Sequence, residues 1–236
     1  MRNLLSFRVL RLAALALIWA YSRPAAAQLV QLPPAPAVSP AGRKLLLDFE
    51  VGGGERYYMR LLARPTWPGF SSGVTIGIGW DCGYNSAAVL RSDWRALEKS
   101  HQDRLASTAG ITGRSAKHRA AALRDILVQW QLAETVFNEV TVTRFWQLTR
   151  RTYPGFDDLR PNAQAALLSL TFNRGSSMSG PRRPEMREVR ALVPRKDYAG
   201  IARQIRAMKH YWPARADSDR DLTDRREAEA KLIELP

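Results

Sequence analysis

The segment from Ser72 to Asp81, SGVTIGIGWD, restricts the possible folds more than any other part of the chain. Its apolar residues alternate with Thr75, Gly77, Gly79 and Asp81, which is the two-residue period of a β-strand with one buried face. Thr75 and Asp81 therefore share one face. A straight strand would separate them by roughly 20 Å at about 3.3 Å per residue. We expect Gly77 and Gly79 to bend the chain, as glycines inside strands often do.

The remaining sequence divides into a short β region and a long helical region. The segment 56–63 is interpreted as a second strand, joined to the strand at 73–81 by a loop rich in proline and glycine. From Asn85 onward, apolar residues recur at spacings of three and four, which predicts helices. We expect them at about 87–106, 115–130, 132–149, 161–173, 184–193, 197–209 and 224–235. The predicted class is α+β and mostly helical, with a small β-sheet lobe and a larger helical lobe.

A further helix is expected before the first strand, from Pro40 to Val51. Ser39 supplies its N-cap, and three glycines at 52–54 end it. Glu50 falls in the last turn, where the negative end of the helix dipole disfavours an ionised carboxylate.

Two carboxyl groups in different protonation states are what glycosidic bond cleavage requires. Glu50 and Asp81 are the candidates for this pair. Each has a structural alternative, because Glu50 could face solvent and Asp81 could cap the helix that follows it. Glu55 competes with Glu50, but it lies beyond the glycines that end the helix.

The first 27 residues have the organisation of a secretory signal peptide. Arginines precede an apolar stretch from Leu12 to Tyr21, and three alanines at 25–27 provide a cleavage site after Ala27. The mature protein is then periplasmic or secreted. About ten apolar residues are too few to span a bilayer, which takes about 20; an uncleaved anchor is the alternative. Residues 28–42 are predicted to form an extended linker rich in proline and alanine, followed by one domain at 43–236.

Without the leader the chain keeps 32 basic and 22 acidic residues, a net charge of +10, which suits an anionic partner. No zinc-finger spacing, phosphate-binding glycine loop or aromatic-interleaved basic stripe favours nucleic acid.

Cys82 is the single cysteine, so an internal disulfide is excluded, and we interpret it as a small buried residue and not as a nucleophile. The three histidines lack the spacing of zinc ligands. No metal and no other cofactor is expected.

Several segments, in order, resemble the phage-type lysozymes of glycoside hydrolase family 24, and among these the pesticin-like muramidase domains. The matching segments lie between about residues 43 and 234, and they are Glu50 with the glycines after it, Ser72–Asp81, Tyr153–Asp157, Pro161–Leu167, Phe172–Gly175 and Leu222–Glu229. The resemblance implies a lysozyme-like fold and cleavage of the β-1,4 bond between N-acetylmuramic acid and N-acetylglucosamine in peptidoglycan.

The resemblance also implies roles for individual residues. It makes Glu50 the general acid. The phage lysozymes have a second carboxylate nine residues later, where this chain has Met59. In the pesticin-like branch an aspartate instead follows a threonine by six residues, as Asp81 follows Thr75. Thr75 and Asp81 are accordingly expected to position or activate water.

The same resemblance places the C-terminal pair Arg225 and Arg226 against the active-site helix. Arg226 is taken as the supporting residue, one arginine is expected to pair with Glu50, and a purely structural salt bridge is the alternative. Peptidoglycan glycan strands are the expected partner, an immunity or inhibitor protein is a further candidate, and the chain is expected to be a monomer.

Three other functions stay open at this point. The absence of a carboxylate at Met59 suits a non-catalytic cell-wall-binding protein. A lytic transglycosylase would need Glu50 alone. The basic charge also fits a protein that binds nucleic acid or lipid.

Overall fold

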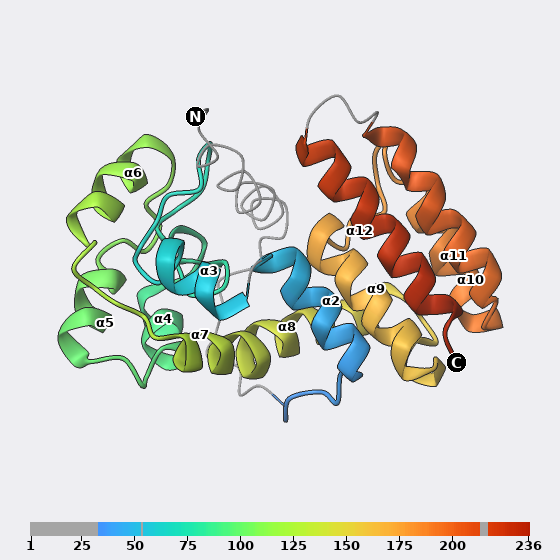
Figure 1. Ribbon diagram of the computed structural model, residues 1–236, viewed down its shortest axis with the longest axis horizontal. Helices are drawn as coiled ribbons and strands as arrows, with labels where there is room; N and C mark the ends of the chain where they lie inside the picture. Colours follow the sequence, from blue (N-terminus) through green and yellow to red (C-terminus); the bar gives the residue numbers. More distant parts are fainter. Residues whose placement is uncertain (1–32, 53, 213–216) are drawn as a thin grey trace. The chain divides into compact units, whose positions relative to one another are not determined.

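The computed structural model describes residues 33–52, 54–212 and 217–236. The predicted signal peptide and the start of the predicted linker lie outside these ranges. The chain forms two compact units (Figure 1): unit 1 contains 50–144, and unit 2 combines 36–49 with 145–236. Within the described ranges the structure is mostly helical, with a two-stranded antiparallel sheet of β1 (Thr75–Ile76) and β2 (Trp80–Asp81), which confirms the α+β class. None of the described helices is long and apolar enough to cross a membrane.

Helix α2 (Pro40–Glu50) forms where the sequence predicts it. The hydroxyl of Ser39 accepts a hydrogen bond from Gly42 N at 3.1 Å, so Ser39 caps the helix as expected. Beyond its end, Gly52 has a φ of 65°, a left-handed conformation that suits glycine. The first residues of α2 lie in the segment predicted as a linker.

Helix α3 (Gly54–Leu61) occupies the segment that the sequence suggested was a strand, so that prediction was wrong. Tyr58 and Leu62, the residue just after the helix, are both buried and lie four residues apart, the spacing of one helix face. The Tyr58 hydroxyl donates a hydrogen bond to the carbonyl of Val128 at 3.0 Å. Burial on this face therefore outweighs the preference of tyrosine for strands.

The other helices of unit 1 follow the sheet in the sequence. They are α4 (Ala87–Asp93), α5 (Lys99–Ala106), α6 (Gly113–Ala122), α7 (Trp130–Val136) and the start of α8 (Val142–Thr152), with a π-helical turn at Phe137–Thr141 between the last two. The single helix predicted at 87–106 is divided into α4 and α5. Helix α6 ends well before the predicted boundary at 130.

Unit 2 is built around a central helix. Its elements after α8 are α9 (Pro161–Arg174), α10 (Pro184–Leu192), α11 (Tyr198–Ala207), α12 (Asp217–Glu234) and short 3₁₀ helices at Phe156–Asp158, Val193–Arg195 and Met208–Tyr211. Every residue of α9 from Ala165 onward is buried, as expected for a helix covered on all sides. Helix α12 packs on α9 and α11, and α11 packs on α10 (Figure 1). On α2, a Cβ at Gly42 would lie 2.1 Å from the Cβ of Ala165, so the glycine permits close packing on α9.

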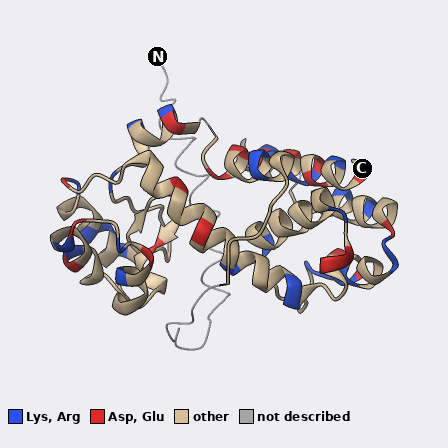
Figure 2. Ribbon diagram, turned by 90° about the horizontal axis from the view of Figure 1, so that it is seen from below, with Lys and Arg blue, Asp and Glu red and all other residues tan. Residues whose placement is uncertain are grey.

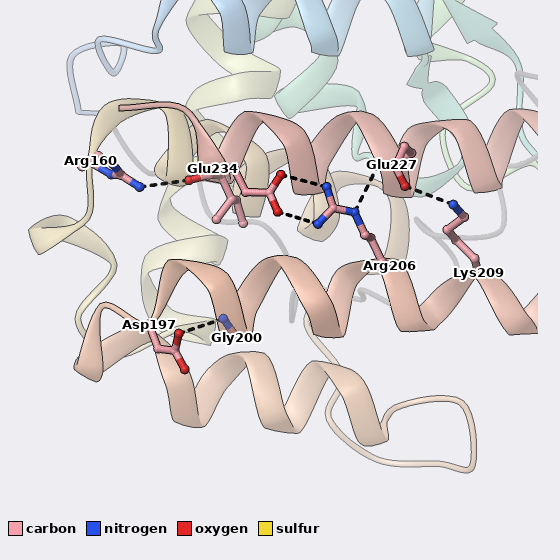
Figure 3. A network of polar contacts seen from close by, with 8 residues as sticks. Arg160, Asp197, Gly200, Arg206, Lys209, Glu227 and Glu234 are labelled. Atoms are coloured by element: carbon pink, nitrogen blue, oxygen red, sulfur yellow. Dashed lines mark hydrogen bonds and ion pairs between the residues drawn. The ribbon is translucent and has the colours of Figure 1, made fainter.

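Charged side chains also join α11 to α12 (Figure 3). The guanidinium group of Arg206 binds both carboxylate oxygens of Glu234, at 2.5 and 2.8 Å, and Glu227 at 3.2 Å. Lys209 approaches Glu227 at 3.1 Å. Ion pairs this exposed contribute little to stability, so the buried apolar residues around α9 hold the unit together.

Candidate active site

The segment 73–81 forms a tight hairpin in place of the single strand expected from its alternation. Strands β1 and β2 pair so that Thr75 lies opposite Asp81. Between the strands, Gly77 and Gly79 have φ angles of 58° and 74°, in the region that favours glycine. The predicted glycine bend is confirmed. Because the chain reverses, the two polar side chains share one face of the hairpin, with Cβ atoms about 4.5 to 5.5 Å apart.

The carboxyl group of Asp81 is surrounded by backbone N–H groups. Its Oδ1 accepts hydrogen bonds from Gly83 N at 2.8 Å and Gly73 N at 3.1 Å, and its Oδ2 accepts one from Gly73 N at 2.9 Å. Asp81 is only 2% exposed, and this burial raises its pKa to about 6, although the backbone hydrogen bonds act in the opposite direction. The bond from Gly83 makes Asp81 the cap of a short 3₁₀ helix at Cys82–Tyr84, whereas α4, the start of the helix predicted at 87–106, is capped by Ser86.

Two glycines make this arrangement possible. A Cβ on Gly73 would lie 2.2 Å from Asp81 Oδ1, and a Cβ on Gly83 would lie 2.8 Å from the Cα of Gly73. Because neither position has room for a side chain, the backbone itself can reach the carboxylate. These donors were not identified from the sequence. The signal available was the presence of glycines before and after Asp81 in the sequence.

The hydroxyl group of Thr75 lacks a partner among the described residues. Thr75 is 5% exposed, and its Oγ1 makes no hydrogen bond within the described chain. Such a group costs about 1–3 kcal/mol and is uncommon in native structures. It lies on the same hairpin face as the Asp81 carboxylate. A water molecule held between a hydroxyl and a carboxylate is a suitable nucleophile for hydrolysis.

Glu50 is the last residue of α2 and is 4% exposed, so the interpretation of Glu50 as a solvent-facing charge is wrong. It belongs to the same unit as the hairpin. The competing carboxylate, Glu55, is exposed in the first turn of α3. Met59, at the position of the phage-type aspartate, is also exposed on α3. Glu50 and Asp81 are therefore the buried carboxylates among those considered as catalytic groups.

A partly buried ion pair supports the second strand. Trp80 Nε1 donates to Asp93 Oδ2 at 3.0 Å, and Arg144 binds both Asp93 oxygens at 2.6 and 2.8 Å. Trp94 lies edge-on to Trp80, with ring centroids 6.2 Å apart. It also covers the hairpin turn, since a Cβ on Gly77 would lie 2.4 Å from Trp94 Cη2. The position of the hairpin is thus fixed by side chains of α4 and α8.

Arg226 lies on α12 in unit 2 and is fully buried, which lowers its pKa to about 10. Its Nη2 donates to Glu229 Oε1 at 2.8 Å. Arg225 Nε contacts the same oxygen at 3.3 Å and Ser169 Oγ at 3.1 Å. Arg226 thus takes part in a structural ion pair within its own helix. The expected pairing of an arginine with Glu50 would join the two units and stays a prediction.

Glu229 was not identified from the sequence as a partner of these arginines. Its spacing three and four residues after the arginine pair was the available signal.

Cys82 is fully buried, and burial raises the pKa of its thiol. A thiol kept neutral is a poor nucleophile, so its interpretation as a small buried residue is confirmed. In the described part of the chain, no group of three His, Cys, Asp or Glu side chains could hold a metal ion.

No protein-family model matches the sequence, and no curated protein matches it. The resemblance to family 24 lysozymes therefore stays a prediction that depends on the short motifs themselves. Among the residues that carry it, Thr75 and Asp81 lie together, and Glu50 belongs to the same unit.

Proposed function

We propose that the protein is an exported peptidoglycan hydrolase with a lysozyme-like fold, a muramidase that cleaves the β-1,4 bond between N-acetylmuramic acid and N-acetylglucosamine. The observation that carries the proposal is the pairing of Thr75 with Asp81, which sets a buried hydroxyl without a hydrogen-bond partner in the described chain opposite a buried carboxyl group. Their six-residue spacing, which resembles that of pesticin-like muramidases, supports the same assignment. The basic charge of the chain suits the anionic cell wall.

In the proposed reaction, Glu50 donates a proton to the leaving glycosidic oxygen. Thr75 and Asp81 hold a water molecule that attacks the anomeric carbon, and Asp81 takes the proton that this water releases. A group with a pKa of about 6 is ionised in about nine molecules of ten at pH 7, which suits a base that works near neutrality. Direct attack requires carboxyl groups about 6.5 to 9.5 Å apart and inverts the configuration. The first product would be the α-anomer, which NMR of a fresh digest resolves.

The capping role of Asp81 favours a second candidate. A carboxylate bound by Gly73 N and Gly83 N can serve structure alone, which would leave Glu50 as the single acid. A lytic transglycosylase works in this way and forms an anhydro sugar. Its substrate is the same, but its product is lighter by one water molecule and its activity would not depend on Thr75.

Purified peptidoglycan separates the two candidates. We expect the wild type to clear a peptidoglycan suspension and release reducing ends, and Glu50→Gln to abolish clearing. Thr75→Val should reduce hydrolysis about a hundredfold but would spare a transglycosylase. Thr143→Val is the matched control, because Thr143 Oγ1 is also buried and unpartnered among the described residues. If the wild type binds peptidoglycan and releases neither product, the enzyme proposal is wrong.

A further inference from the structure

Phe70 combines two features that do not favour folding. Its side chain is 70% exposed, the highest value among the exposed large apolar residues of the described chain. Its backbone has a φ of 49°, in the left-handed region that bulky residues rarely adopt. Because the ring is mostly in contact with solvent, it contributes little hydrophobic stabilisation to the fold, and the left-handed backbone adds strain. A contact with a ligand would account for both features.

Trp67 lies in the same loop and is held in a fixed position. Its Nε1 donates to the carbonyl of Ser72 at 3.1 Å, and Lys117 Nζ of α6 lies 5.7 Å from the centroid of its ring. The loop is bound to the start of α6, because Gly113 N donates to the same Ser72 carbonyl at 2.9 Å. The loop and α6 therefore form one continuous surface.

Helix α6 adds positive charge to this surface. Arg114 and Lys117 are exposed, and the first turn of the helix contains no acidic residue. No ion pair within the described chain includes them, whereas Arg91 and Arg104 of the same unit each pair with an aspartate. Helices α3, α4 and α5 of the same unit instead carry both signs of charge (Figure 2). The charge on α6 is thus available to an anionic ligand.

The backbone connects this surface to the proposed active site. Thr66 and Thr75 exchange backbone hydrogen bonds at 2.8 and 2.9 Å. Gly73, which donates to Asp81, forms a bridge with Thr112, the residue before α6. A polymer bound on the loop would therefore lie on residues that are hydrogen-bonded to the catalytic hairpin.

We propose that Trp67, Phe70, Arg114 and Lys117 form a platform for the glycan strand of peptidoglycan, with a sugar ring on Phe70 and a carboxylate of the lactyl-peptide substituent at Arg114 and Lys117. The inference rests on the proposed function and adds the position and chemistry of one contact with the polymer. Peptidoglycan combines sugar rings, which pack on aromatic faces, with carboxylates, and the platform offers a partner for each. A lipid surface would instead require a broad apolar face, and Phe70 is a single exposed ring.

Binding on ice to insoluble peptidoglycan and to chitin tests the platform, with the wild type and with Glu50→Gln as parents. Chitin has a similar β-1,4-linked N-acetylated backbone without carboxylates. Phe70→Asn keeps a residue that tolerates positive φ and should weaken binding to both polymers about tenfold. Arg114→Gln with Lys117→Gln should weaken binding to peptidoglycan about fivefold and leave chitin binding unchanged.

Two controls match these changes. Arg190→Gln with Arg203→Gln removes the same charge from exposed positions in unit 2, and Leu235→Asn removes another exposed apolar side chain. Both should bind like their parents. If Arg114→Gln with Lys117→Gln and Arg190→Gln with Arg203→Gln weaken binding to peptidoglycan equally, the effect is general charge attraction and the platform is overturned. Unchanged binding by Phe70→Asn would also overturn it, as would binding to anionic phospholipid vesicles with none to peptidoglycan.

This test is separable from the test of the proposed function, because it measures binding and not cleavage. Cleavage by the wild type together with undiminished binding of Phe70→Asn would refute the platform and leave the hydrolase intact. Binding that depends on Phe70 without any cleavage would support the platform and refute the hydrolase.

Discussion

Thr75 lies directly opposite Asp81 across a hairpin that reverses within three residues. The reversal depends on Gly77 and Gly79, both in the left-handed region. Two groups that a straight strand would hold far apart are therefore fixed on one small element. The hydroxyl and the carboxylate can serve one water molecule without any movement of larger parts.

Replacing Thr75 with valine removes a buried hydroxyl that has no partner in the described chain, with little change of shape. We expect the free energy of unfolding to stay the same or rise by up to about 1 kcal/mol, because valine also suits a strand. Peptidoglycan cleavage should fall about a hundredfold. Urea unfolding and reducing-end release measure the two effects. Thr143→Val should show the same small effect on stability as Thr75→Val and should keep full activity. A parallel loss of stability and activity in Thr75→Val would instead indicate that Thr75 has a structural role.

Burial raises the pKa of Asp81 from 3.8 to about 6. The native state then holds this proton more tightly than the unfolded state, so the contribution to stability is complete below about pH 4 and is lost as the pH rises through about 6. A shift of about two units corresponds to about 3 kcal/mol. Urea unfolding at several pH values should show the wild type losing stability relative to Asp81→Asn over this range. A constant difference between the two proteins would contradict the raised pKa.

Alanine substitutions at two glycines distinguish the cost of backbone strain from the cost of a steric clash. Gly77 and Gly110 have φ angles of 58° and 76°, but only at Gly77 would a Cβ meet a neighbour, Trp94. We expect Gly110→Ala to cost about 1 kcal/mol from strain alone. Gly77→Ala should cost about 1–3 kcal/mol more and should also reduce peptidoglycan cleavage, since the turn aligns the hairpin. Equal losses of stability in urea would show that Trp94 does not hold the turn.

The ion pair of Asp93 with Arg144 provides a test of the support beneath the hairpin. In Arg144→Met the buried carboxylate of Asp93 keeps the hydrogen bond from Trp80 but loses its cation. We expect the protein to lose about 2–4 kcal/mol of stability in urea unfolding. Arg104→Met breaks the exposed pair with Asp125 and should have a much smaller effect. Similar losses of stability in the two variants would mean that the partly buried pair has no special role.

Local rules predicted much of the helical structure. Ser39 and the glycines from Gly52 bound α2 as predicted, because capping and chain-breaking signals lie in the residues at the helix ends themselves, and the helix predicted at 161–173 forms as α9. Helix α3 was wrongly predicted as a strand. Over eight residues the choice depends on burial against distant partners, such as the Val128 carbonyl that binds Tyr58.

The candidate site was predictable in part. The spacing of Thr75 and Asp81, with glycines between them, indicated a bend that the structure confirms. The glycines on both sides of Asp81 were visible in the sequence, but the N–H groups of Gly73 and Gly83 could not be assigned as its donors, because backbone donors depend on how the loops approach one another and not on side-chain type. From the sequence, helix capping and a catalytic role were alternatives for Asp81, whereas the structure shows a capping bond on the same side chain that is proposed for the site.

The most direct test of the account is the release of reducing sugar ends from purified peptidoglycan by the wild type, Glu50→Gln and Asp81→Asn. Asparagine is a good N-cap, so Asp81→Asn should remain folded, which circular dichroism can verify. The account predicts release by the wild type and none above background by either variant. No release by the wild type, or undiminished release by either folded variant, would contradict it.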